Sequence, residues 1–321
     1  MTAPTHTLPV VHAAQLDEPD PAHHWLIESL WARAAVGLVG GAPKTNKTYL
    51  ALDIALSVAS ATPCLGTFAV HDPGSVLLYM AEDAQAVVKE RLLALCRHRQ
   101  LDLRAVSVHV ITAPTVRLDR DADQYRLENT VGLYRPRLLV LDPLVRMHGL
   151  NENAAHEIAA LLAYLRGLQR AHDLAVLLFH HTRKKGSAAA QGGQNLRGSG
   201  DLYAWADCCL SLHRRPDARL ILTPEHRAAA SPQPIALTLL RADAAADDTH
   251  LHVVDALAPA DPAQHRLEQL LLAALADAPQ SRAQLRQALR IRNETLGHLL
   301  NHFAAQGRIV HRDGLWSVPF P

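Results

Sequence analysis

Cysteine, aromatic residues and long apolar runs are all scarce in this 321-residue chain. The four cysteines form no C-x-x-C pair, so neither a disulfide framework nor a cysteine zinc site is indicated. No apolar run reaches the roughly 18 residues of a membrane span, and no signal-peptide pattern opens the chain. We therefore expect a cytoplasmic protein that makes no membrane contact.

An excess of charge of one sign is absent as well. Lysine and arginine together number 32 and aspartate and glutamate 31, which gives a formal net charge of +1. Any binding of nucleic acid must therefore come from local basic patches. The hydrophobic content of 49% is ample for a buried core, and the twenty histidines are scattered along the chain.

The pattern of apolar segments predicts four parts: an N-terminal arm (1–24), a large domain (25–255), a linker (256–263) and a small C-terminal domain (264–321). In the large domain, short apolar runs alternate with helical stretches, which indicates a mainly parallel sheet covered by helices. The last strands follow one another directly, so they should extend the sheet antiparallel. The predicted strands are 35–40, 75–80, 106–111, 137–141, 175–180, 207–213, 219–223, 235–240 and 251–254. The predicted helices are 47–60, 84–99, 122–134 and 154–172.

The C-terminal domain has the pattern of a winged helix. A helix over 265–276 should be followed by a second one in SRAQLRQAL, with Ser281 as its N-cap. Asn293 should cap a third helix that ends at Gly307, and a hairpin should turn at Asp313-Gly314. Between residues 281 and 314 there are six arginines against two acidic residues. This excess suits DNA, but a solvated face or a protein-docking surface fits it nearly as well.

Residues 41–48 read GAPKTNKT and match the phosphate-binding pattern G-x-x-x-x-G-K-[ST] except that Asn46 replaces the second glycine. The segment lies between a strand and a helix, where backbone N–H groups and the helix dipole attract an anion. After glycine, asparagine best tolerates the positive φ of this position, so we expect the loop to bind phosphate. Lys47 would contact the β- and γ-phosphates of ATP, and Thr48 would ligate Mg²⁺. The predicted nucleotide contacts are Gly41, Ala42, Pro43, Lys44, Thr45, Asn46, Lys47, Thr48 and Tyr49.

Two acidic positions complete the predicted site. In PRLLVLDPL a buried strand ends at Asp142, which could hold the Mg²⁺ shell through water. Pro143 follows it, so the base that orients the attacking water must come from elsewhere. Glu82, just past the strand in SVLLYMAEDA, is the best candidate. In the alternative interpretation, Glu82 or Asp83 only stabilises a helix N-terminus, and Asp83 is the next candidate for the base.

A third strand ends at His180-His181 in LAVLLFHHTRKKG. His181 could sense the γ-phosphate, although paired histidines at strand ends also occur for packing reasons. The basic, small-residue stretch KKGSAAAQGGQNLRGSGDL follows. We interpret it either as a contact for nucleic acid or as a solvated loop.

These motifs together resemble the RecA-like ATPases, and more closely the RepA-type plasmid and phage replicative helicases, the AAA_25-like group. The resembling segments, between residues 25 and 255, are GGAPKTNKTYLALDIA, LLYMAED, LLVLDPLVRMH, LLFHHTRK and NLRGSGDLYAWADCCLSL. The resemblance implies a hexameric ring that holds ATP and Mg²⁺ between subunits, where a neighbour's arginine completes each site.

The resemblance also implies roles for individual residues. Glu82 takes the position of the catalytic glutamate and His181 that of the sensor. Arg197 is a candidate arginine finger, with a contact to DNA phosphate as its alternative role. Arg227 matches the second basic position of a Lys-x-Arg pair, but Glu225 stands where the lysine would be.

The leading hypothesis is therefore an ATP-hydrolysing, ring-forming DNA motor or helicase that serves plasmid, phage or mobile-element replication. It would act on single-stranded DNA and meet a replication-initiation partner. The alternative is an ATP-switched DNA-binding or helicase-loader protein without unwinding activity. A small-molecule P-loop kinase fits less well, because it has no use for the basic loop or the winged helix.

Overall fold

The computed structural model contains two compact units, Met1–Asp255 and Ala256–Pro321. A large sheet organises the first unit, and a small three-stranded sheet belongs to the second. The structure describes residues 10–16, 24–151, 155–181, 200–215, 217–241, 248–254, 267, 270–275, 278–289, 291–305, 308–312 and 314–318.

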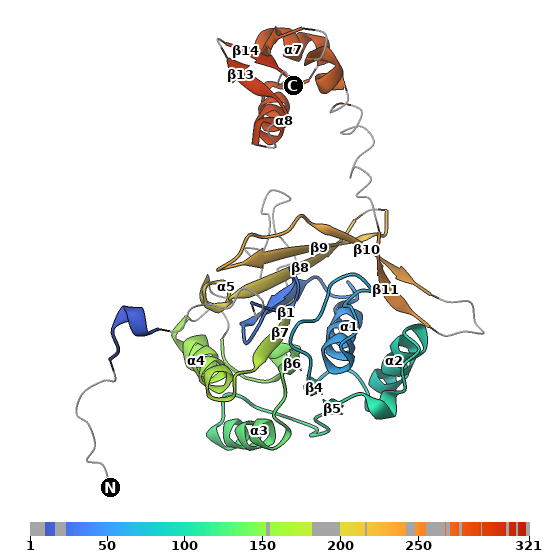
Figure 1. The fold of residues 1–321 in the computed structure, drawn as a ribbon, viewed down its shortest axis with the longest axis vertical. Helices are drawn as coiled ribbons and strands as arrows, with labels where there is room; N and C mark the ends of the chain where they lie inside the picture. Colours follow the sequence, from blue (N-terminus) through green and yellow to red (C-terminus); the bar gives the residue numbers. More distant parts are fainter. Residues whose placement is uncertain are drawn as a thin grey trace. The chain divides into compact units, whose positions relative to one another are not determined.

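Nine strands form the central sheet of the first unit (Figure 1). They are β3 (Val36–Gly41), β4 (Val76–Met80), β5 (Val108–Val110), β6 (Leu138–Asp142), β7 (Ala175–His181), β8 (Cys208–Arg214), β9 (Leu220–His226), β10 (Ile235–Leu240) and β11 (His250–Val253). Their order is β11-β10-β9-β8-β3-β7-β6-β4-β5. The six neighbouring strands β8, β3, β7, β6, β4 and β5 run parallel to one another. Strands β9, β10 and β11 extend the sheet beyond β8, each antiparallel to the strand before it. The predicted α/β fold with a mainly parallel sheet is confirmed.

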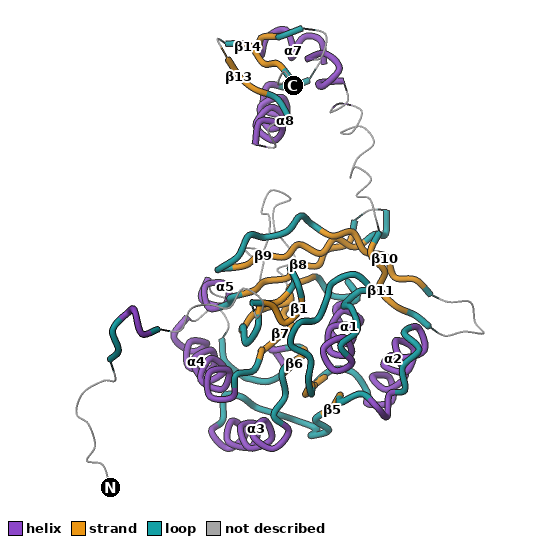
Figure 2. The backbone as a smooth tube through the Cα atoms, viewed as in Figure 1, coloured by secondary structure: helices purple, strands orange, loops and turns teal. Residues whose placement is uncertain are grey.

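Helices cover both faces of this sheet, as the connections between parallel strands require (Figure 2). One hydrophobic cluster joins the sheet to α1 and α2, and a second joins it to α3, α4 and α5. These helices are α1 (Lys47–Ser60), α2 (Gln85–His98), α3 (Asp121–Tyr134), α4 (Ala155–His172) and α5 (Gly200–Trp205).

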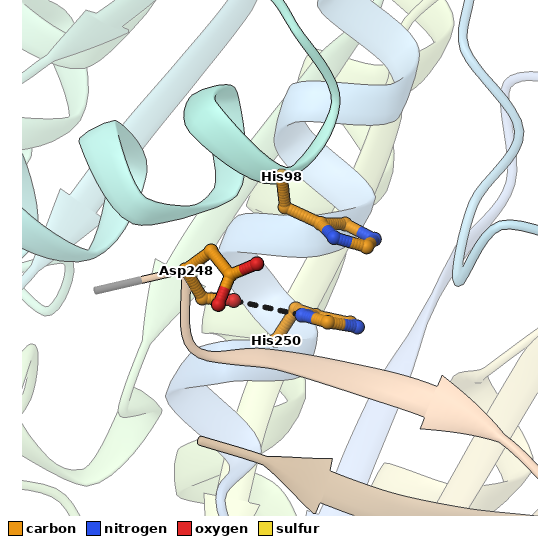
Figure 3. Close-up of side chains that lie close together, drawn as sticks. All are labelled: His98, Asp248 and His250. Carbon is orange, nitrogen blue, oxygen red and sulfur yellow. Dashed lines mark hydrogen bonds between the residues drawn. The ribbon is translucent and has the colours of Figure 1, made fainter. Parts of the chain in front are cut away.

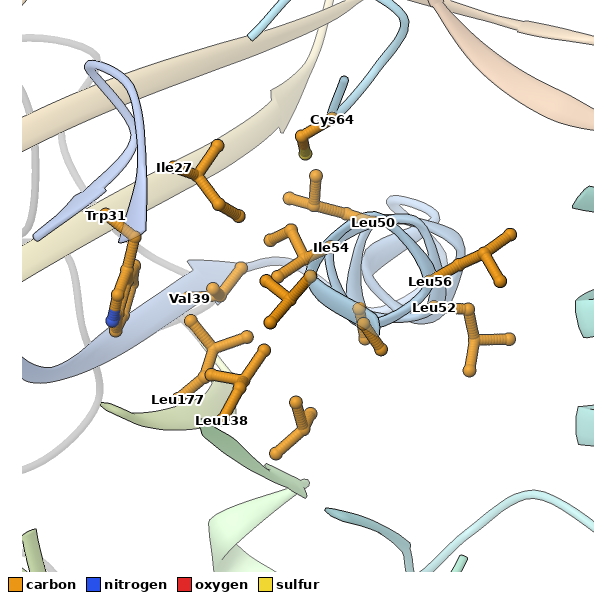
Figure 4. Packing of buried hydrophobic residues seen from close by; sticks show 14 of the residues in the cluster. Ile27, Trp31, Val39, Leu50, Leu52, Ile54, Leu56, Cys64, Leu138 and Leu177 are labelled. Atoms are coloured by element: carbon orange, nitrogen blue, oxygen red, sulfur yellow. The ribbon is translucent and has the colours of Figure 1, made fainter. Parts of the chain in front are cut away.

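The central strands read as continuous apolar runs because both of their faces are buried. In β6, Leu138 and Val140 belong to the cluster under α1, whereas Leu139 and Leu141 belong to the cluster on the other face. Figure 4 shows Leu138 among the apolar side chains that surround α1. The buried strands thereby fix the positions of the loops at their carboxyl ends.

A short hairpin beside the sheet was not predicted. It consists of β1 (Trp25–Ile27) and β2 (Trp31–Ala32), and the side chain of Trp31 is buried. Strands of two or three residues are too short to show an alternating pattern, so the sequence alone does not reveal them.

The second unit contains β12 (Gln280–Ser281), α7 (Arg282–Leu289), α8 (Asn293–Ala305), β13 (Val310–Arg312) and β14 (Leu315–Ser317). Ser281 caps α7 as predicted: its hydroxyl accepts from the Gln284 N–H, and the Gln284 side chain accepts from the Ser281 N–H. β13 and β14 pair antiparallel, and β12 pairs with β14. The winged-helix assignment remains a prediction, and the linker 256–263 lies outside the described residues.

No helix in the described part of the chain combines the length and apolar character needed to cross a membrane.

Candidate nucleotide-binding site

The carboxyl ends of four parallel strands bring the predicted site residues together. Gly41 of β3 pairs in register with His181 of β7, and Met80 of β4 pairs with Asp142 of β6. The Ala81 N–H donates to the Asp142 carbonyl at 2.7 Å, which holds the segment carrying Glu82 against the end of β6. The P-loop, Glu82 and Asp142 therefore share one edge of the sheet, together with the backbone of His181.

The loop between β3 and α1 has the backbone that a P-loop requires. Asn46 has φ 63° and ψ 27°, in the left-handed region, and its side chain makes no capping hydrogen bond. The expectation that asparagine occupies a positive-φ position here is confirmed. Lys44 also has a positive φ, 65°, which the motif did not predict.

Gly41 permits the close packing at the start of this loop. A Cβ at this position would lie 2.6 Å from the Leu212 carbonyl oxygen and 2.9 Å from the Thr45 hydroxyl. The Thr45 hydroxyl donates to the Ala42 carbonyl at 2.8 Å across the turn. Any side chain at Gly41 would therefore push the loop away from β8.

The Lys47 side chain is buried and folds back over the loop. Its ammonium donates to the carbonyls of Gly41 at 3.0 Å and Ala42 at 2.9 Å. Burial lowers the pKa of this ammonium, and the charges of Asp142 and Glu82 oppose that effect. The loop carbonyls thus hold a desolvated cation at the position from which P-loop lysines contact phosphate.

Asp142 is the most perturbed carboxyl of the site. Burial raises its pKa to about 7, with the Lys47 charge opposing this rise and Asp83 and Glu82 adding to it. A hydrogen bond with the Thr48 side chain also favours the charged form. A buried carboxyl in contact with a threonine hydroxyl, beside further carboxylates, is an oxygen-rich donor set that fits Mg²⁺.

The two candidates for the catalytic base, Glu82 and Asp83, have different partners in the structure. Glu82 accepts from Arg146 Nε at 2.7 Å, and both side chains are largely exposed. Asp83 instead pairs with Arg91 of α2 at 3.1 Å, and that guanidinium lies over the ring of Tyr49. Asp83 is thus tied to its own helix, whereas the partner of Glu82 comes from η4 (Leu144–Arg146), directly after Asp142.

Arg227 lies at the opposite edge of the sheet. Its N–H donates to the Asp207 carbonyl, and its guanidinium pairs with the Asp207 carboxylate at 3.2 Å. Gly41 pairs instead with Leu212 on β8. Leu212 is five residues beyond Asp207, which is about 16 Å along an extended strand. Arg227 is therefore too distant to reach the P-loop of its own subunit, and Arg197 lies outside the described residues.

Two arginines that contact the site were not predicted from the sequence. Arg146 contacts Glu82 from 64 positions away, and Arg214 donates to the Lys44 carbonyl from the end of β8 at 3.2 Å. Arg214 ends a strand that runs parallel to β3, so strand alignment could have suggested it. No local pattern indicates the contact of Arg146.

The sheet, the P-loop and the acidic residues Glu82 and Asp142 define a P-loop nucleoside triphosphatase with a RecA-type fold. The chain belongs to the AAA domain family AAA_25, whose model matches residues 2–187. A structure titled "Crystal structure of the RadB recombinase" has the same fold, with a TM-score of 0.51 at 16% identity over 70% of this chain and 92% of that chain. None of the curated protein sequences matches.

The Asn46 backbone yields a prediction. Asn46→Gly should retain or raise the affinity for an ATP analogue measured by calorimetry, because glycine adopts the left-handed conformation without strain. Asn46→Ala should weaken binding by about five- to thirtyfold, since the left-handed region costs alanine about 1–2 kcal/mol. A large loss in Asn46→Gly would instead show that the Asn46 side chain contacts the nucleotide.

The raised pKa of Asp142 yields a second prediction. Its folded pKa of about 7 lies above the ordinary 3.8, so its contribution to stability is present below pH 3.8 and is lost as the pH rises to about 7. The loss is at most about 4 kcal/mol. Without nucleotide or Mg²⁺, Asp142→Asn should gain stability over the wild type between pH 5 and pH 8, measured as the melting temperature. The exposed Asp121→Asn is the control, and an equal difference at both pH values would contradict the assignment.

Proposed function

We propose that the protein is an ATP-hydrolysing DNA motor that assembles as a homo-oligomeric ring, with plasmid, phage or mobile-element replication as its setting. The observation that carries the ATPase part is the convergence of Lys47, Thr48, Asp142 and Glu82 at one edge of a RecA-type sheet. The fold shared with a structure titled as a recombinase supports DNA as the partner. A hexamer, single-stranded DNA and a replication-initiation partner are the finer parts of this proposal.

In the proposed reaction the P-loop amides and Lys47 bind the β- and γ-phosphates of ATP. Thr48 and Asp142 would hold Mg²⁺, which neutralises phosphate charge when bound. Glu82 orients the attacking water and accepts its proton. The pairing with Arg146 directs Glu82 towards η4, so Glu82 must exchange this partner for water during turnover.

Three further residues have proposed roles. We assign His181 as the γ-phosphate sensor, because its backbone lies beside Gly41 in the sheet register. Arg197 is proposed as a finger that reaches a neighbouring subunit, with a DNA-phosphate contact as its alternative. Arg227, at the edge opposite its own P-loop, suits only a contact with another subunit's site.

Replacing the proposed base tests the chemistry. Glu82→Gln should bind ATP normally but hydrolyse it about 10²–10⁴ times more slowly, because an amide cannot accept the proton. Asp83→Asn is the matched control, since Asp83 pairs with Arg91, and it should keep most of its turnover. The assignment fails if Glu82→Gln turns over ATP at the wild-type rate, or if Asp83→Asn alone loses it.

Strand separation tests the motor. Wild-type ATPase should rise when single-stranded DNA is added, and the protein should separate a forked duplex while ATP lasts. Lys47→Ala should lose both activities, with a melting curve run beside it because Lys47 is buried. ATP-dependent binding to duplex DNA without strand separation would favour the ATP-switched loader instead.

A further inference from the structure

Three metal-binding side chains meet at a place that the nucleotide site does not use. His98 is the last residue of α2, His250 is the first residue of β11, and Asp248 lies two residues before it (Figure 3). One ligand atom from each lies within 4.8 Å of the other two. Among the described residues, no other group of three histidines, cysteines or carboxylates offers ligand atoms this close. Residues about 150 positions apart in the sequence thus converge here.

The two imidazoles are already arranged face to face. Their ring centres are 3.4 Å apart, and their planes differ by 15°. His250 is buried, and its Nδ1 lies 2.7 Å from the Asp248 carbonyl oxygen. A carbonyl can only accept, so Nδ1 carries the proton and Nε2 the lone pair of the neutral ring. Figure 3 shows Nε2 on the side of the ring away from Asp248, so the His250 ring or the Asp248 carboxylate must turn for both to bind one ion. A second-nitrogen hydrogen bond of this type orients most metal-ligating histidines.

The surroundings leave room for a cation. A cavity of about 280 Å³ is lined by both histidines, by Arg99 and by the segment that follows α1. The Arg99 guanidinium pairs at 2.6 Å with the Asp53 carboxylate, which lines the same cavity, so the positive charge of Arg99 is partly offset beside the histidines.

We propose that His98, Asp248 and His250 form a binding site for Zn²⁺, with water as the fourth ligand. Two imidazoles and one carboxylate are the ligands of known three-residue zinc sites. Tetrahedral zinc with bonds of about 2.0 Å holds its ligand atoms about 3.3 Å apart, so the 4.8 Å spread must shrink. Each lone pair lies in its ring plane, so the exposed His98 must also rotate out of the stack.

The site would connect the C-terminal end of α2 to the edge strand β11. The cavity is lined by Asp53 within α1 and by the segment after this helix, whereas the P-loop precedes it, so about 9 Å of helix lies between Asp53 and Lys47. Zinc here would therefore stabilise the end of the sheet without contacting nucleotide. The proposal is independent of the proposed ATPase function.

Zinc titration of the untagged full chain tests the proposal. Calorimetry with ZnCl₂ should give one site per chain, and the melting temperature should rise with zinc and return with a chelator. His98→Ala, Asp248→Asn and His250→Ala should each weaken this site at least about tenfold. His71→Ala removes another exposed histidine and is the control, and Asp142→Asn reports any zinc bound at the P-loop.

The variants distinguish a specific site from its absence. His98 is exposed, so His98→Ala tests the site even if the buried His250→Ala does not fold. Loss of the site in His98→Ala and Asp248→Asn, with His71→Ala unchanged, would support the assignment. No saturable zinc binding in the wild type, or equal binding in His98→Ala and the wild type, would overturn it.

Discussion

Two desolvated charges of opposite sign, the Lys47 ammonium and the Asp142 carboxyl, dominate the nucleotide site. Burial lowers the pKa of the lysine and raises that of the carboxyl, and each charge partly offsets the penalty of the other. The lysine ammonium donates hydrogen bonds to the carbonyls of Gly41 and Ala42. Burial thus favours the neutral form of each group, and phosphate and Mg²⁺ would each favour the charged form of the group that they contact.

Such charges can be held in place because the sheet beneath them is fixed from both sides. β3, β4, β6 and β7 are buried on both faces, so a shift of register would expose apolar side chains on one face or the other. Their common register places Met80 level with Asp142, and Gly41 only two residues further towards the same edge. The precision of the site therefore derives from packing below the loops more than from contacts within them.

How well a feature can be predicted from the sequence depends on the range of the interaction that forms it. Buried parallel strands leave an apolar run, and a P-loop leaves a local motif, so the sheet, Asn46 and the ends of β4 and β6 could be predicted. The contact of Arg146 with Glu82 joins residues 64 positions apart, and the β1–β2 hairpin is too short to show a period. The His98–Asp248–His250 cluster likewise depends on β11 pairing at the far edge of the sheet, which no local pattern encodes.

Helix α1 separates two kinds of cation chemistry. Before it, a hydroxyl and a carboxyl form a hard oxygen donor set, which suits Mg²⁺ and its retained waters. Near its other end, two imidazoles and a carboxylate form a softer set, which favours zinc and its neighbours in the transition series. Because magnesium binds imidazole poorly, abundant Mg²⁺ would not displace zinc from the histidines. Ligand type, rather than affinity alone, would keep the two ions apart within one compact unit.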